Sequence, residues 1–113
     1  MGESRIEVFA QMAQAEPGNE MVWYGLANEL VKAERWSEAA DALRRVLSLN
    51  PDYTAAYQLL GTSLLRQGET AEARKVWRQG VEAADRTGAW KARQHMEGLL
   101  ASAGAEPPAD FCE

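Results

Sequence analysis

The chain has 113 residues, of which 46% are hydrophobic and 26% charged, and its formal net charge is −5 at pH 7. This length is typical of one domain, and no apolar run approaches the roughly 20 residues that a membrane-spanning helix needs. The acidic balance argues against nonspecific binding to nucleic acid, which depends on Lys and Arg at the phosphates. No basic stretch followed by an apolar one stands near Met1, so we expect no secretory signal.

The charges are distributed unevenly along the chain. Residues 1–43 hold eight acids and three bases, a balance of −5, whereas residues 44–102 hold six acids and nine bases, a balance of +3. This asymmetry can steer a charged partner or favour head-to-tail association, although charged surfaces usually only interact with solvent. The single cysteine, Cys112, excludes an internal disulfide and fits a reducing compartment, so we expect a cytoplasmic protein.

The first element in chain order is a predicted amphipathic helix over residues 4–15. Its apolar face follows the three-four spacing of a helix and consists of Ile6, Phe9, Met12 and Ala13. Ser4 is a candidate N-cap. Pro17 and Gly18 end the helix, because proline cannot donate a backbone hydrogen bond and glycine tolerates a turn.

Two similar helical pairs follow, and they coincide when the chain is shifted by 34 positions. The first pair is predicted at 20–33 and 37–49, and the second at 54–67 and 70–86. The matching positions are Trp23 with Tyr57, Leu26 with Leu60, Ala27 with Gly61, Leu30 with Leu64, Ala39 with Ala73, and Leu43 with Trp77. A fixed period of this size is typical of stacked repeats.

The predicted helix ends rest on turn and capping residues. Ser37 and Thr70 are candidate N-caps of the second helix in each pair. Asn50 precedes a proline and so favours a stop. Gly68 stands where a left-handed residue ends a helix, a conformation that costs glycine least. Thr87 and Gly88 break the chain after the second pair.

The last predicted helix spans residues 89–102 and is amphipathic. Its apolar face carries Ala92, Met96, Leu99 and Leu100, and its outer face carries Lys91, Arg93, Gln94 and Glu97. A polar outer face is what the terminal helix of a stack requires. Residues 103–113 contain two prolines and no periodicity, so we expect a disordered tail.

No strand pattern is visible, and the predicted fold class is all-α, with six helices in antiparallel pairs. The repeat resembles the tetratricopeptide repeat (TPR) family, whose signature is a large aromatic, Leu, a small residue, then Ala and an aromatic, and finally proline. The first copy shows Trp23, Leu26, Ala27, Leu30, Ala39, Leu43 and Pro51; the second shows Tyr57, Leu60, Gly61, Leu64, Ala73 and Trp77, with Asp85 in place of the proline. The resemblance implies one domain over residues 4–102, a right-handed superhelical stack made of a half-repeat (4–19), two repeats (20–53 and 54–87) and a capping helix (88–102).

The resemblance also implies a protein-interaction module without catalysis, which holds a peptide or a partner's segment in a concave groove. The family geometry places the groove at Met21, Tyr24, Asn28, Val31, Gln58, Thr62, Leu65, Arg66 and Arg93. Met21 and Tyr24 are the expected apolar anchors, with packing under a neighbouring helix as the alternative. Some members clamp a partner's terminal carboxylate. The five clamp positions hold Tyr24, Asn28, Leu59, Ala89 and Arg93, and only Asn28 and Arg93 match.

Residues that could carry catalysis or bind a metal are few. His95 is the only histidine and has no second ligand at helical spacing, so a surface histidine is the simpler interpretation. No glycine-rich phosphate loop or nucleophile with a base is visible, and we expect no cofactor, no metal and no enzymatic activity. Two alternatives to the groove remain: a self-assembling subunit that forms a homodimer through the N-terminal edge at Phe9 and Met12, and an accessory domain of a larger complex.

Overall fold

The computed structural model describes residues 2–104, and within this range the chain forms six α-helices and no strand. The helices are α1 (Gly2–Ala15), α2 (Glu20–Lys32), α3 (Trp36–Leu49), α4 (Thr54–Arg66), α5 (Thr70–Thr87) and α6 (Trp90–Gly104). The predicted all-α class is confirmed. Residues 105–113, most of the expected disordered tail, lie outside the described residues, whereas residues 103 and 104 continue α6.

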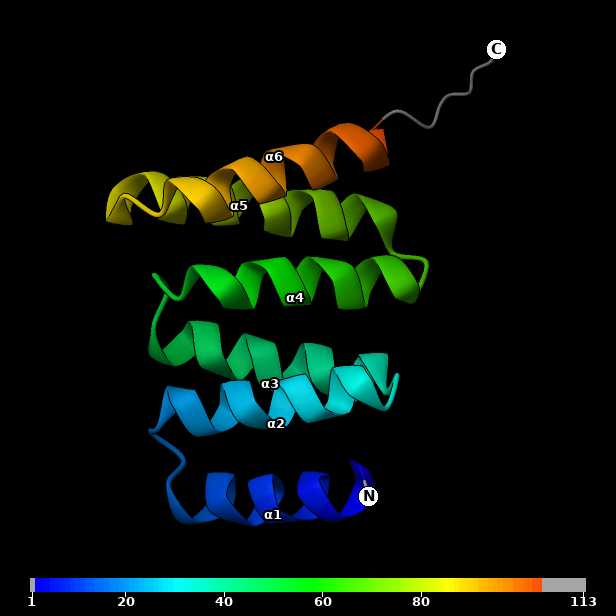
Figure 1. Cartoon of the computed structure of the whole chain (residues 1–113), viewed down its shortest axis with the longest axis vertical. Helices are drawn as coiled ribbons and strands as arrows, with labels where there is room; N and C mark the ends of the chain where they lie inside the picture. Colours follow the sequence, from blue (N-terminus) through cyan, green and yellow to red (C-terminus); the bar gives the residue numbers. More distant parts are fainter. Residues whose placement is uncertain (1, 105–113) are drawn as a thin grey trace.

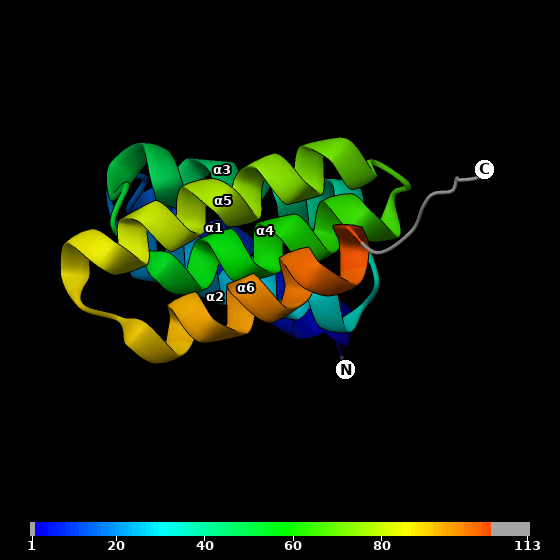
Figure 2. The same ribbon diagram turned by 90° about the horizontal axis from the view of Figure 1, so that it is seen from above.

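The helices stack along one axis, with α1 at one end and α6 at the other (Figure 1), and the molecule measures 50 × 30 × 19 Å. Each helix packs mainly on its neighbours in the chain, and α4 also contacts α6. Viewed along the stack, α3 and α5 lie on one side and α4 and α6 on the other (Figure 2). The first helix of each pair therefore belongs to one layer and the second helix to the opposite layer.

The core consists of the positions that the 34-residue period predicts. Leu26, Ala27 and Leu30 of α2 are buried, as are their α4 counterparts and the inward positions of α3 and α5. Met96 of α6 is fully buried at 0% exposure. Met12 lies on the predicted apolar face of α1 but is 40% exposed. Among the described helices α1 packs mainly on α2, which leaves this part of its surface exposed.

The repeat also recurs in the hydrogen bonds that fix the start of each pair. Trp23 Nε1 donates to the carbonyl of Pro17 at 3.0 Å, and the Tyr57 hydroxyl donates to the carbonyl of Pro51 at 2.7 Å. Burial raises the pKa of Tyr57 above its ordinary value. The two bonds stand one repeat apart, so the sequence period corresponds to an equivalent three-dimensional unit.

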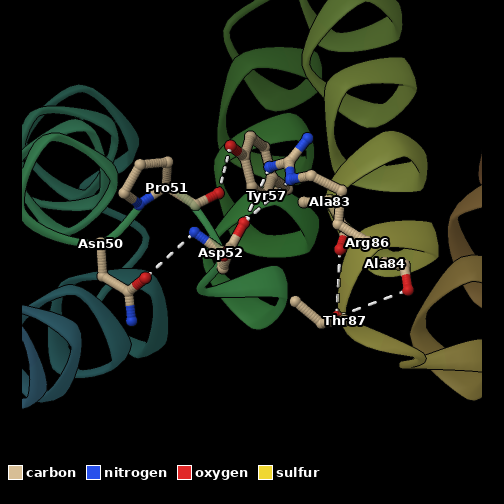
Figure 3. A network of polar contacts seen from close by, with 8 residues as sticks. All are labelled: Asn50, Pro51, Asp52, Tyr57, Ala83, Ala84, Arg86 and Thr87. Atoms are coloured by element: carbon tan, nitrogen blue, oxygen red, sulfur yellow. Dashed lines mark hydrogen bonds and ion pairs between the residues drawn. The ribbon is translucent and has the colours of Figure 1, made fainter.

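A polar network fixes the loop before α4 to the end of α5. Arg86 donates from Nη2 and Nε to Asp52 Oδ1 at 2.8 and 3.1 Å, as Figure 3 shows. Asn50 Oδ1 accepts from the backbone N–H of Asp52 at 3.0 Å, and the Thr87 hydroxyl bonds back to Ala83. The Asp52–Arg86 pair is solvent-exposed, so we assign it a role in loop orientation rather than in stability.

The residues that end helices were predicted more accurately than the N-cap residues. Gly68 (φ +82°) is left-handed and Asn50 is extended, as expected. Gly88 (φ +76°), which was expected only to break the chain, is left-handed as well. The three predicted N-caps are wrong: Ser4 and Ser37 lie inside α1 and α3, and Thr70 is the first residue of α5.

The residues that precede α3 and α5 explain this difference. The backbone N–H groups of Arg35 and Glu69 each donate to a carbonyl of the preceding helix, Leu30 and Leu64, at 2.9 Å. These bonds close one helix and position the chain to enter the next helix immediately, so Arg35 and Glu69 become the N-cap residues without a side-chain cap. Glu34, one repeat before Gly68, is also left-handed (φ +59°), which the sequence did not indicate.

Gly61 is a point of close approach between α4 and α5. A Cβ atom at this position would collide with the indole ring of Trp77. The ring is 1% exposed, and its Nε1 donates to the carbonyl of Gln58 at 3.3 Å, so it has little freedom to move away.

We therefore predict that Gly61→Ala lowers the free energy of unfolding by about 1–3 kcal/mol through overpacking. This loss outweighs the helix propensity that alanine contributes, about 1 kcal/mol. The control is Gly98→Ala in α6, where a Cβ would meet no atom within 4 Å and the variant should gain about 0.5–1 kcal/mol. Urea denaturation followed by circular dichroism measures both, and equal shifts of the same sign would contradict this packing.

Candidate partner-binding groove

Two rows of half-buried side chains run along the first helices of the two pairs. The α2 row is Tyr24, Asn28 and Val31, and the α4 row is Gln58, Thr62 and Leu65. Each row follows the i, i+4, i+7 spacing of one helix face. The α4 row stands one repeat after the α2 row, so the two rows occupy equivalent places on helices of the same layer.

An aromatic pair connects the two rows. The rings of Tyr24 and Tyr53 have centroids 4.9 Å apart and planes inclined by 36°. Tyr53 directly precedes α4, and the Asn50 side chain donates to Glu20 of α2 at 3.2 Å beside it. Burial, with a smaller contribution from Tyr24 and Glu20, raises the pKa of Tyr53. An aromatic surface and phenol hydroxyl groups therefore lie together at the junction of α2 and α4.

Sequence reasoning missed Tyr53. Its position could have indicated a role, because Tyr53 directly precedes α4, the first helix of the second pair, and so lies near the start of the α4 row. The alternative for Tyr24 was that it packs under a neighbouring helix. Its ring does pack against Tyr53, but Tyr24 remains only half-buried.

The polar residues of the rows make the same local bond in both copies. Asn28 Nδ2 donates to the carbonyl of Tyr24 at 3.2 Å, and the Thr62 hydroxyl donates to the carbonyl of Gln58 at 3.1 Å. Within residues 2–104, the side-chain oxygen of Asn28 and the side-chain amide of Gln58 make no hydrogen bond. Both groups are therefore available to a ligand.

Of the three remaining predicted residues, one is strongly exposed and two contact other side chains of the chain. Met21 is 70% exposed at the start of α2. The guanidinium of Arg66 lies 5.5 Å from the centroid of the Trp36 ring, at the start of α3. Arg93 pairs with Asp85 at 3.1 Å and with Glu97 at 3.2 Å.

Comparisons with known proteins agree on one family. The tetratricopeptide repeat profile matches residues 30–96, more than half of the chain. This chain belongs to the tetratricopeptide repeat family. A TPR repeat-containing protein of Pseudomonas aeruginosa is 31% identical over 95 residues, which cover 84% of this chain and 90% of the relative.

Solved TPR structures show the same fold. A tetratricopeptide repeat domain protein from Salinibacter ruber superposes with a TM-score of 0.75 and 26% identity, over 81% of this chain and 93% of that one. The TPR2B domain of yeast Sti1, in a complex with pHsp70, superposes with a TM-score of 0.83 at 16% identity, over 90% of this chain and 82% of that one. TPR domains are protein-interaction modules, and the recognition made from the repeat is thereby confirmed.

Two further features of the described part of this TPR domain concern metal-binding residues and membrane-spanning helices. His95 is exposed. No three His, Cys, Asp or Glu side chains of residues 2–104 come together as a metal site. None of the helices within that range is long and apolar enough to cross a membrane.

The N-terminal edge of the TPR stack is only partly covered. The Phe9 ring packs against Gly25 of α2, whereas Val8 is 52% and Met12 40% exposed. Pairing of two copies through this edge depends on uncovered apolar surface there. Phe9 does not provide that surface but Val8 and Met12 do, so the homodimer stays a prediction.

Proposed function

We propose that the groove formed by α2 and α4 binds a short segment of a partner protein, and that the domain acts by binding rather than by catalysis. The observation that carries the proposal is the Tyr24–Tyr53 aromatic pair beside unbonded amide groups. The residues assigned to the groove are Met21, Tyr24, Asn28, Val31, Tyr53, Gln58, Thr62 and Leu65, with Arg66 and Arg93 at the rim.

The chemistry of these side chains suits peptide recognition. Tyrosine provides a large, amphipathic contact area with few rotatable bonds, and it is enriched among the residues that dominate binding energy. The free oxygen of Asn28 accepts a hydrogen bond, and the Gln58 amide can both donate and accept. A peptide backbone presents the complementary groups along its whole length, so these amides can bind it without regard to its side chains.

The proposed ligand is an uncharged, partly apolar segment rather than an acidic C-terminus. A terminal carboxylate requires several converging cationic or amide donors to offset its desolvation. Only Asn28 and Arg93 match the five clamp positions, and Arg93 already has two carboxylate partners. The rows themselves carry Tyr, Asn, Val, Gln, Thr and Leu, none of which is charged.

The test uses peptides selected from a random library against the wild-type domain. Tyr24→Ala is expected to weaken binding of a selected peptide at least about tenfold, since truncating a central aromatic typically costs 2 kcal/mol or more. Isothermal titration calorimetry measures the dissociation constants. Trp90→Ala removes an exposed aromatic from another helix and is the matched control, with no expected change. Equal binding by wild type and Tyr24→Ala would rule out the groove as the binding surface.

A further inference from the structure

A second apolar pocket lies outside the proposed groove, between α1 and α3, with α2 as its floor. Its volume is about 430 Å³. Ile6 and Ala10 line it from α1, Trp23 and Leu26 from α2, and Ala42 from α3. Asp41 and Arg45 stand at its rim, and the Arg45 guanidinium lies 5.5 Å from the centroid of the Trp23 ring. Pockets of this size and lining bind small ligands or inserted side chains.

The repeat register shows which residues keep this pocket open. Ala10 corresponds to Arg44 one repeat later, and Ala42 corresponds to Val76, so larger side chains stand at these two equivalent places between α3 and α5, whereas Ile6 corresponds to the smaller Ala40. The exposure of the aromatic residue at the two places also differs. Trp23 of α2 is half-buried, whereas its counterpart Tyr57 of α4 is only 8% exposed. The first pair therefore offers an aromatic and aliphatic surface that the second pair covers.

A side chain that fits such a pocket stands at the opposite end of the stack. Trp90, the first residue of α6, is 64% exposed, and its described ring contact is with Lys91, whose Nζ lies 5.8 Å from the ring centroid. The stack separates α1 from α6 along the long axis of the molecule, which measures 50 Å (Figure 1). Trp90 therefore cannot reach the pocket of its own chain.

A carboxylate at the pocket and an ammonium group beside Trp90 carry opposite charges. At the pocket rim, the Asp41 side chain is 78% exposed and its described partner, Arg44, is 3.6 Å away. Lys91 stands next to Trp90 and has no carboxylate partner among the described residues. Opposite charges steer the two surfaces together and disfavour contact between like ends.

We propose that the pocket binds Trp90 of a second copy of this chain, with Lys91 facing Asp41 at the rim. The two surfaces differ, so the contact is heterologous and each copy has one pocket and one indole to offer. It differs from pairing of two N-terminal edges, since it joins opposite ends of the stack. It also leaves the α2–α4 groove unoccupied, and its failure would not affect the proposed function.

The test compares wild type with two variants by sedimentation equilibrium of the full chain, up to about millimolar concentration, because a contact anchored by one side chain is weak. Trp90→Ala removes the exposed indole. Ala42→Val fills the pocket with the side chain already present at position 76. Each substitution is expected to lower the association constant at least about tenfold. Leu49→Ala, which shortens an exposed side chain outside the pocket, is the control and should associate like wild type.

Mixing the variants gives the decisive result. An equimolar mixture of Trp90→Ala and Ala42→Val retains one intact pocket and one intact indole, so it should form heterodimers with about the wild-type association constant, whereas each variant alone associates at least about tenfold more weakly. Thermal melting of each variant at low concentration checks that both fold. The proposal is overturned if wild type stays monomeric throughout, if Trp90→Ala associates like wild type, or if the mixture of folded variants stays monomeric.

Discussion

Trp77→Ala is expected to lower the free energy of unfolding by about 3–5 kcal/mol, the range for removing a buried tryptophan. Trp77 is 1% exposed, its ring packs flat against Gly61 of α4, and its Nε1 donates to the carbonyl of Gln58 at 3.3 Å. The substitution therefore leaves both a cavity and a lost hydrogen bond between α4 and α5. Urea denaturation followed by far-UV circular dichroism measures the change.

The matched control for Trp77→Ala is the same substitution at Trp90. Trp90 is 64% exposed, so its removal should change stability by no more than about 0.5 kcal/mol, as for most surface substitutions. Similar losses at the two positions would show that α5 does not pack on α4 as described.

Leu60→Ala is expected to lower the free energy of unfolding by about 2–5 kcal/mol. Leu60 is 3% exposed in the middle of α4, which packs on both α3 and α5. Small domains are stable by only about 5–15 kcal/mol, so this loss is a large fraction of the total. Thermal and urea unfolding measure it.

Leu49→Ala provides the comparison for Leu60→Ala, because Leu49 at the end of α3 is 36% exposed and its truncation should cost much less. Wild-type-like melting of Leu60→Ala would contradict the 34-residue register, which aligns Leu60 with the buried Leu26.

The sequence predicted the helices and the core well because both follow from local periodicity. Positions such as Leu26 and Leu60 recur one repeat apart, and stacking pairs must bury the same face each time. Met12 violates the pattern because a helix at the edge of a stack has no neighbour on one side, which periodicity alone does not reveal.

Features that depend on turns and on contacts between repeats were harder to predict. The left-handed Glu34 and the early start of α3 at Trp36 result from backbone bonds that close the preceding helix, and these bonds leave no strong signal in residue type. The ring contact between Tyr24 and Tyr53 depends on how far α4 is displaced from α2. Periodicity therefore predicts which side chains share a face on α2 and on α4, but it does not identify Tyr53, the residue whose ring joins the two rows.

The most direct test of the proposed groove is an amide chemical-shift map of the isotopically labelled chain, titrated with a selected peptide. The account predicts that the largest shifts fall on Tyr24, Asn28, Gln58 and Thr62, with the outer surfaces of α3 and α5 unchanged. Shifts concentrated on α3 and α5, with the two rows unaffected, would contradict the assignment of the groove to α2 and α4.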